Sequence, residues 1–173
     1  MNSRAVGKNM MGMLWEMERM IPVLPTRHRD TGTTLGWSMD VRLDAYPGSL
    51  RIARKIAATA ALTAGATRMA AFELETALGE ALTNAFLHAY GGDPRGRIVI
   101  RFEFVDGGLR VTVRDGGRTL HAIPPIPKEV TPGVESGRGL FLMSRLMDDV
   151  EVIHPDRGGR GTAIRMTKRL SAN

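Results

Sequence analysis

Three polar side chains recur at every fourth position near the middle of the chain: Glu80, Asn84 and His88. In an α-helix, residues four apart lie on one face, one turn above another. Asparagine is unfavourable inside helices because its amide competes for backbone hydrogen bonds. A row of carboxylate, amide and imidazole could hold a hard cation or position a proton acceptor. The same row could also be an ordinary solvated helix face, so its meaning depends on the rest of the chain.

The segment from about Thr67 to Tyr90 is predicted to be the helix that carries this row. A second face of this segment is apolar at helical spacing, which indicates that it packs on a core. The residues of that face are Leu74, Leu78, Ala81, Leu82, Ala85 and Ala89. Upstream, Trp37 to Ala45 alternates like a strand. A second helix is expected from about Leu50 to Ala64, with Ser49 as its cap and Gly65 at its end.

Downstream of that helix, the pattern changes to strands and glycine-rich turns. Arg97 to Phe104 and Leu109 to Arg114 are predicted to be strands joined by a tight hairpin turn. Asp115-Gly116-Gly117 follows directly. The stretch 118–136 contains four prolines and has no period, and loops of this length are usually functional lids or disordered segments.

A second glycine-rich turn, Ser136-Gly137-Arg138-Gly139, opens an apolar run that is predicted to be a helix. Free backbone N–H groups and the positive end of the helix dipole suit a phosphate at such a start. The last predicted strands are Val150 to Ile153 and Thr162 to Leu170. A glycine-rich turn alone is weak evidence, and the order of the segments is more specific than any one of them.

Composition limits the classes of protein. A chain of 173 residues with 43% hydrophobic residues is expected to form one globular domain. There is no cysteine, which excludes disulfides and fits a reducing compartment. No apolar run reaches the length of a membrane span and the N-terminus does not resemble a signal peptide, so a cytoplasmic protein without membrane contact is expected. The net charge of +6 comes from dispersed residues, and only 5% are aromatic, which argues against direct nucleic-acid binding.

The first 35 residues differ from the rest and are interpreted as an N-terminal extension and linker. Methionines at helical spacing between Met10 and Met20 predict a short amphipathic helix, more typical of a packing or dimer surface than of a cofactor site. Residues 22–36 are rich in Pro, Thr, Gly and Arg and are predicted to be a linker. Residues 36–173 are predicted to be the functional domain.

In this order and spacing, the segments resemble the GHKL superfamily of ATPases, which includes gyrase and the histidine kinases. EALTNAFLHAY resembles the family's N box, VRDGG its first glycine box, SGRGLFLMSRLMDDV its second, and GRGTAIRM its closing Gly-Thr segment. The histidine-containing helix and the GLFLM…LMDDV run are similar to the bacterial anti-sigma factor serine/threonine-protein kinases. The resemblance implies a histidine kinase-like ATPase domain. Its fold would be an α/β two-layer sandwich of the Bergerat type, with helices on one face of a mixed sheet.

The resemblance also implies roles for particular residues. Glu80 would be the general base that takes the proton of an attacking hydroxyl. Asn84 would hold Mg²⁺, which bridges the phosphates of ATP. Asp115 would accept the adenine amino group, and Gly117 would let the backbone approach the adenine closely.

The second glycine box and the Gly-Thr segment would complete the nucleotide site. Gly137 and Gly139 would leave N–H groups open to the phosphates, and Arg138 would add charge. Thr162 would support Asp115 at the adenine end. For His88, a structural hydrogen-bonding role is favoured over a catalytic one.

The same resemblance implies partners: a sigma factor held inactive, an anti-anti-sigma protein of the STAS type as the phosphorylated antagonist, and a second copy in a homodimer. The alternative is an ATP-binding module that sequesters a protein partner without kinase activity. The presence of Glu80 favours the kinase, although Glu80 could also be a simple surface carboxylate. A sensor histidine kinase would need a longer dimerisation unit than the first 35 residues supply. Two departures from the family pattern are Ala89, where a glycine is common, and Thr119, which replaces the second glycine of the first box.

Overall fold

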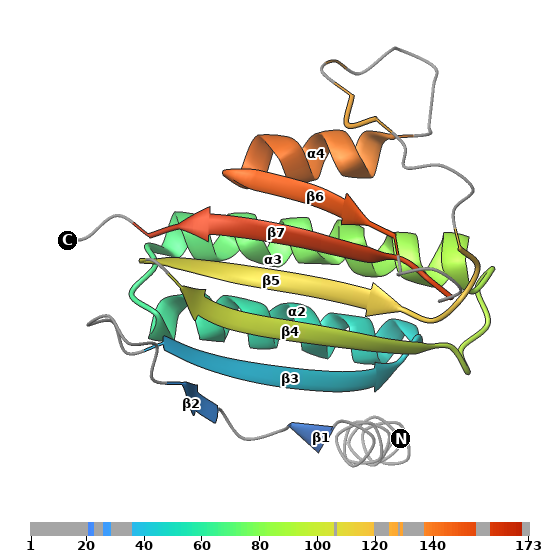
Figure 1. The fold of residues 1–173 in the computed structure, drawn as a ribbon, viewed down its shortest axis with the longest axis horizontal. Coiled ribbons are helices and arrows are strands. Elements are labelled where there is room, and N and C mark those ends of the chain that lie inside the picture. The colour runs from blue at the N-terminus through green and yellow to red at the C-terminus, as the bar shows by residue number, and fades with distance from the viewer. Residues whose placement is uncertain are drawn as a thin grey trace, which may run out of the picture.

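The computed structural model describes residues 21–22, 26–28, 36–105, 107–119, 125–127, 129, 137–154 and 160–170. Figure 1 shows a curved sheet with the helices on one of its faces. The strands are β1 (Ile21–Pro22), β2 (Thr26–His28), β3 (Gly36–Asp44), β4 (Arg97–Val105), β5 (Gly108–Asp115), β6 (Asp149–Ile153) and β7 (Ala163–Arg169). The helices are α2 (Pro47–Thr63), α3 (Arg68–Asn84), a π-helical turn η1 (Ala85–Ala89) and α4 (Arg138–Leu146).

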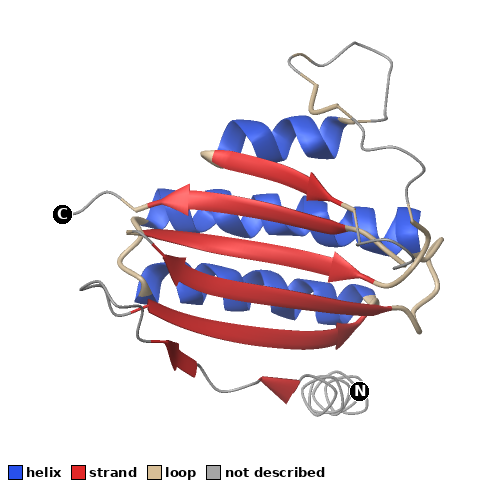
Figure 2. Cartoon of the chain, viewed as in Figure 1, coloured by secondary structure: helices blue, strands red, loops and turns tan. Residues whose placement is uncertain are grey.

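The sheet has the strand order β1-β3-β4-β5-β7-β6, with β2 also paired to β3. The helices cover one face (Figure 2), so the predicted two-layer α/β arrangement is confirmed. The predicted mixed sheet is wrong, because every pairing in the described part of the chain is antiparallel. Two helices between β3 and β4 return the chain to the end of the sheet that it left. β5 and β6 do run in the same direction, but β7 lies between them and pairs with both.

The helical hairpin α2–α3 forms close to the predicted bounds. Helix α2 begins earlier than expected: Tyr46 is its N-cap and Pro47 stands in its first turn, where the fixed φ of proline suits a helix start. The prediction that Ser49 caps this helix is therefore wrong, and Ser49 is buried inside the first turn. Gly65 follows the helix with a φ of 91°, as a C-terminal glycine should. The Thr67 hydroxyl then accepts a hydrogen bond from Ala70 N at 3.1 Å and begins α3.

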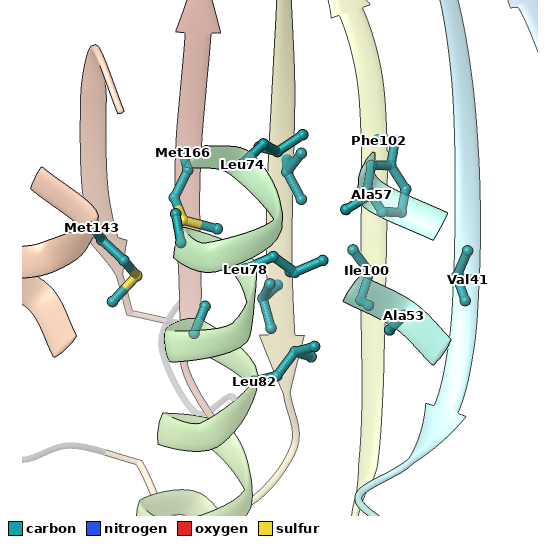
Figure 3. Close-up of a cluster of buried hydrophobic side chains, with 14 of the residues drawn as sticks. Val41, Ala53, Ala57, Leu74, Leu78, Leu82, Ile100, Phe102, Met143 and Met166 are labelled. Carbon is teal, nitrogen blue, oxygen red and sulfur yellow. The ribbon is translucent and has the colours of Figure 1, made fainter. Parts of the chain in front are cut away.

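One hydrophobic core lies between the sheet and the helices (Figure 3). Leu74, Leu78 and Leu82 of α3 point toward the sheet and are fully buried. Ile100 and Phe102 of β4 lie beside Ala53 and Ala57 of α2 in the same core and are also fully buried. This apolar stripe places the polar face of α3, with Glu80 and Asn84, away from the sheet, because the two faces of one helix cannot both enter the core.

The segment expected to be a linker contributes strands. β1 and β2 both pair with β3, so these residues extend the sheet rather than only connecting it. The amphipathic helix predicted between Met10 and Met20 lies outside the described residues, as does most of the stretch 118–136. Among the helices that the structure describes, none is long and apolar enough to cross a membrane.

Candidate functional site: a pocket at the end of the organising helix

A pocket of about 330 Å³ opens where α3, η1, β5 and the start of α4 meet. In Figure 1 these segment ends gather on the right-hand side, together with the start of β7. The pocket wall includes five of the predicted site residues: Asn84, Asp115, Gly137, Gly139 and Thr162. They come from segments up to 78 positions apart, so the fold brings together most of what the motifs singled out.

Asp115 ends β5 as a buried carboxylate, with 8% of its surface exposed. Its Oδ1 accepts a hydrogen bond from Gly117 N at 3.0 Å. Burial raises the pKa of Asp115 above its ordinary value, although backbone hydrogen bonds from Gly117 and Thr162 act in the opposite direction. A buried acceptor at the wall of an apolar pocket suits a ligand that brings a hydrogen-bond donor, such as an aromatic amino group.

Gly117 lies directly against the backbone of the π-helical turn. A Cβ on Gly117 would collide with the carbonyl oxygen of Ala89, so no other residue fits without moving one of the segments. The adjacent Arg118 N donates to that same carbonyl at 3.0 Å. The turn after β5 is therefore held against η1, and this contact alone requires a glycine at position 117. The close approach of Gly117 to adenine stays a prediction.

Tyr90 ties the same region together from the other side. Its hydroxyl accepts a hydrogen bond from Gly116 N at 2.8 Å and donates one to the Arg97 carbonyl. Gly96 packs against the Tyr90 ring and leaves no room for a side chain of its own. Tyr90 thus links the turn after β5 to the start of β4, and the sequence reasoning assigned it no role.

The end of the organising helix is not regular. A single α-helix was predicted as far as Tyr90, but the chain widens after Asn84 into η1, where Tyr90 N bonds the Ala85 carbonyl at 3.2 Å. Short π-helical turns inside helices are frequent at functional sites. The extra residue per turn shifts His88 relative to Glu80 and Asn84, and His88 lines the pocket as an exposed side chain.

Glu80 and Asn84 face the start of α4. A Cβ placed on Gly139 would lie 3.1 Å from Glu80 Oε2 and 3.4 Å from Asn84 Oδ1, so both side chains lie against this glycine. Asn84 lines the pocket, whereas Glu80 lies just outside its wall. The carboxylate and the amide therefore sit one turn apart beside the glycine-rich helix start, as their spacing predicted.

The start of α4 offers backbone donors. Gly137 is its N-cap with a φ of 83°, and no side chain caps the helix there. The first turn of this helix contains no acidic residue that would compete for its N–H groups. Such an end attracts anions. Arg138 is exposed and is not part of the pocket wall, whereas Gly137 and Gly139 are.

The residues present fit a magnesium ion only if a ligand supplies most of its coordination. Within the described residues, no group of three or more His, Asp or Glu side chains could hold a metal. Asn84 offers one amide oxygen beside the helix start. Magnesium is commonly held by one or two protein oxygens together with phosphate oxygens and water, so this donor set suits a metal–nucleotide complex rather than a lone ion.

The apolar walls of the pocket were not predicted as functional. They are formed by Ala81, Ala85, Val113, Leu140, Val152 and Ile164. One signal could have found part of this wall: Val111, Val113 and Asp115 alternate along β5, so Asp115 continues the inward-facing side of the strand. Arg118 also lines the pocket, and its place directly after the glycine turn was the available hint.

The model of the histidine kinase-like ATPase domain matches residues 43–168. Because this range covers most of the chain, the protein belongs to the family of histidine kinase-like ATPase domains. The match includes α2, α3, the pocket and every predicted site residue.

Curated relatives narrow the resemblance. An anti-sigma F factor of Bacillus cytotoxicus is 34% identical over 103 residues, covering 57% of this chain and 69% of the relative. The anti-sigma F factor of Oceanobacillus iheyensis is 33% identical over 103 residues, with the same coverage. The motif-based resemblance to the GHKL superfamily, and within it to the anti-sigma branch, is confirmed.

A solved structure supports the fold assignment. The crystal structure of the RsbU and RsbW domains of a Mycobacterium tuberculosis protein matches with a TM-score of 0.58 and 25% identity. The match covers 79% of this chain but only 33% of the other chain. The present chain therefore spans about a third of that larger protein.

Proposed function

We propose that this protein is an anti-sigma factor that binds Mg-ATP and phosphorylates a serine or threonine of a protein antagonist. The observation that carries the proposal is the arrangement around Gly139, where Glu80 and Asn84 lie against the start of α4 beside the pocket that contains Asp115. The similarity to relatives named anti-sigma F factors also supports the proposal that this protein is an anti-sigma factor. By the same likeness, the partners would be a sigma factor and a STAS-type anti-anti-sigma protein, bound by a homodimer in the cytoplasm.

Different residues would bind the adenine and the phosphates, at opposite ends of the pocket. Asp115 would accept a hydrogen bond from the adenine amino group, between the apolar walls of Val113 and Ile164. The backbone N–H groups at the start of α4 would bind the phosphates. Asn84 would hold the magnesium ion, which supplies neutralisation of phosphate charge when bound.

The proposed reaction needs a base beside the terminal phosphate. Glu80 would take the proton of the attacking serine or threonine hydroxyl. The hydroxyl oxygen would form a bond to the γ-phosphorus, and the bond between the γ-phosphorus and the β–γ bridging oxygen would break, releasing ADP. Because Glu80 lies just outside the pocket wall and next to Gly139, it would face an incoming protein hydroxyl rather than the nucleotide itself.

The test separates binding from phosphate transfer. Calorimetric titration with ATP, with and without Mg²⁺, is expected to give magnesium-dependent binding near micromolar, about −8 kcal/mol. The Glu80→Ala variant should still bind Mg-ATP but should no longer transfer ³²P from γ-labelled ATP to a candidate antagonist. Undiminished transfer by this variant would remove Glu80 as the base.

The second candidate is an ATP-binding module that sequesters a protein partner without kinase activity. The observation in its favour is that Glu80 does not line the pocket. In that case wild-type protein would bind Mg-ATP and a sigma factor but transfer no phosphate to any candidate antagonist. The absence of ATP binding at millimolar concentration would contradict the nucleotide site itself.

A further inference from the structure

Thr119 makes a contact that the family pattern does not foresee. It stands where the first glycine box usually has its second glycine, and its Oγ1 accepts a hydrogen bond from Gly161 N at 3.0 Å. The two residues are 42 positions apart, so the bond joins the loop after β5 to the turn before β7. A glycine at position 119 has no side chain that could accept this bond.

Gly161 in turn lies on the backbone of Asp115. Its φ is 91°, and a Cβ at this position would collide with the Asp115 carbonyl oxygen. The close packing means that a shift of the Gly161 turn would be transmitted to the backbone of Asp115.

The next residue, Thr162, completes the link to the buried carboxylate. Asp115 N donates to the Thr162 carbonyl at 3.0 Å. The backbone N–H of Thr162 is also one of the donors that act on the Asp115 carboxyl group. Asp115 is thus held between the turn at Gly117 and the turn at Gly161, and Thr119 connects these two turns.

We propose that Thr119 is a positioning residue for adenine recognition. Its hydroxyl holds the Gly161–Thr162 turn in place, and this turn orients the Asp115 carboxylate toward the amino group of the base. The inference rests on the proposed ATP site and adds to it a residue that acts through Asp115 rather than by touching the nucleotide.

The test compares two nucleotides that differ only at the amino group. ATP and purine riboside 5′-triphosphate, which lacks the 6-amino group, are titrated into wild-type protein, Thr119→Val and Thr119→Ser with Mg²⁺ present. Valine has nearly the shape of threonine but leaves the Gly161 N–H unpaired. This variant is expected to bind ATP roughly 5- to 10-fold more weakly, the size of one net hydrogen bond. Its affinity for purine riboside triphosphate should change by less than twofold, whereas Thr119→Ser should keep the wild-type preference.

Thr59→Val is the matched control, because the Thr59 hydroxyl donates a hydrogen bond to the Lys55 carbonyl within α2, and Thr59 does not line this pocket. Thermal unfolding of each variant shows that it is folded. The inference is overturned if Thr119→Val keeps the full preference for ATP, or if it loses affinity for both nucleotides equally, as a merely structural role would require. Failure of the wild-type protein to bind ATP would instead overturn the proposed function, and this inference with it.

Discussion

Asp115 is a buried carboxylate, and burial of a carboxylate is costly. It has two opposing influences on its charge, because burial raises its pKa and the N–H groups of Gly117 and Thr162 lower it, and burial is the larger. In the absence of a ligand, the ionised side chain therefore weakens the folded state. Such a compromise is what the proposed binding role of Asp115 would lead us to expect, because a ligand that donates a hydrogen bond would stabilise the buried carboxylate.

The pH dependence of stability tests this view of Asp115. Because the pKa of Asp115 is raised in the folded state, the stability that it contributes is fully present below its unfolded pKa of about 3.9 and is lost as pH rises through the folded pKa. The Asp115→Asn variant lacks this titration. Its free energy of unfolding relative to wild type should therefore rise from pH 4 to pH 7 without nucleotide, as measured by urea unfolding. A difference that stays flat or falls over this range would contradict the raised pKa.

Asn84 is the residue on which the metal assignment depends. The Asn84→Ala variant should lose the magnesium-dependent part of ATP binding, because its amide oxygen is the proposed ligand. Calorimetry with and without Mg²⁺ measures this loss. Thr83→Ala is the neighbouring control, since the Thr83 hydroxyl bonds the Gly79 carbonyl on the exposed side of α3. Tight Mg-ATP binding by Asn84→Ala would refute the assignment of Asn84 as the metal ligand.

At the scale of elements, the start of α4 matters because a side chain at position 139 would press on the Glu80 and Asn84 side chains of α3. The polar face of α3 and the glycine-rich start of α4 approach until Gly139 contacts both Glu80 and Asn84. Two elements from distant parts of the chain thus create one edge of the site. The π-helical turn η1 makes the other edge, where Ala89 meets Gly117.

Replacing Gly139 with alanine should therefore lower the affinity for Mg-ATP without lowering the stability of the fold. Alanine favours the helical conformation over glycine by up to about 1 kcal/mol, so the variant should be no less stable in thermal unfolding. Its Cβ would displace the Glu80 and Asn84 side chains, and Mg-ATP affinity should fall about tenfold, or about 1.4 kcal/mol.

Ser144→Ala, further along α4, provides the comparison, because the Ser144 hydroxyl donates a hydrogen bond to the Phe141 carbonyl and Ser144 does not line the pocket. It should keep the affinity of the wild-type protein for Mg-ATP. Unchanged affinity in Gly139→Ala would show that the contact with Glu80 and Asn84 has no role in the site.

At the scale of the whole molecule, one core holds the pocket in shape. The pocket shares its support with the core, because α3 carries the core leucines on one face and site residues on another. Loosening the core should therefore weaken the site as well as the fold. The antiparallel sheet transmits this effect, since β5 and β7 bring Asp115 and Thr162 together as neighbours.

Leu78→Ala tests the role of this core. Leu78 is fully buried between α3 and the sheet, so its truncation should lower the free energy of unfolding by about 2–5 kcal/mol. Urea unfolding measures the change. Leu62→Ala on α2 is the control, because Leu62 is 50% exposed and should change stability by less than about 0.5 kcal/mol. Equal effects of the two substitutions would contradict the proposed core.

Local spacing was enough to predict the described helices and most strands, and the resemblance of the motifs to a known superfamily supplied the family. The period of α3 depends only on neighbouring residues, and so does the alternation of β4 and β5. The motifs around Asn84, Asp115 and Gly139 also predicted residues that the fold brings to one place. These features are encoded within a few turns of chain, which is why sequence reasoning reached them.

The tertiary structure alone decided the features that depend on contacts between distant segments. β5 and β6 run in the same direction but do not pair with each other, because β7 lies between them, an arrangement that no local period records. The π-helical turn forms where the end of α3 packs on the turn after β5, and the bond from Gly161 to Thr119 crosses 42 positions. Such contacts arise when elements pack, and their geometry is set by the whole core rather than by any one stretch of sequence.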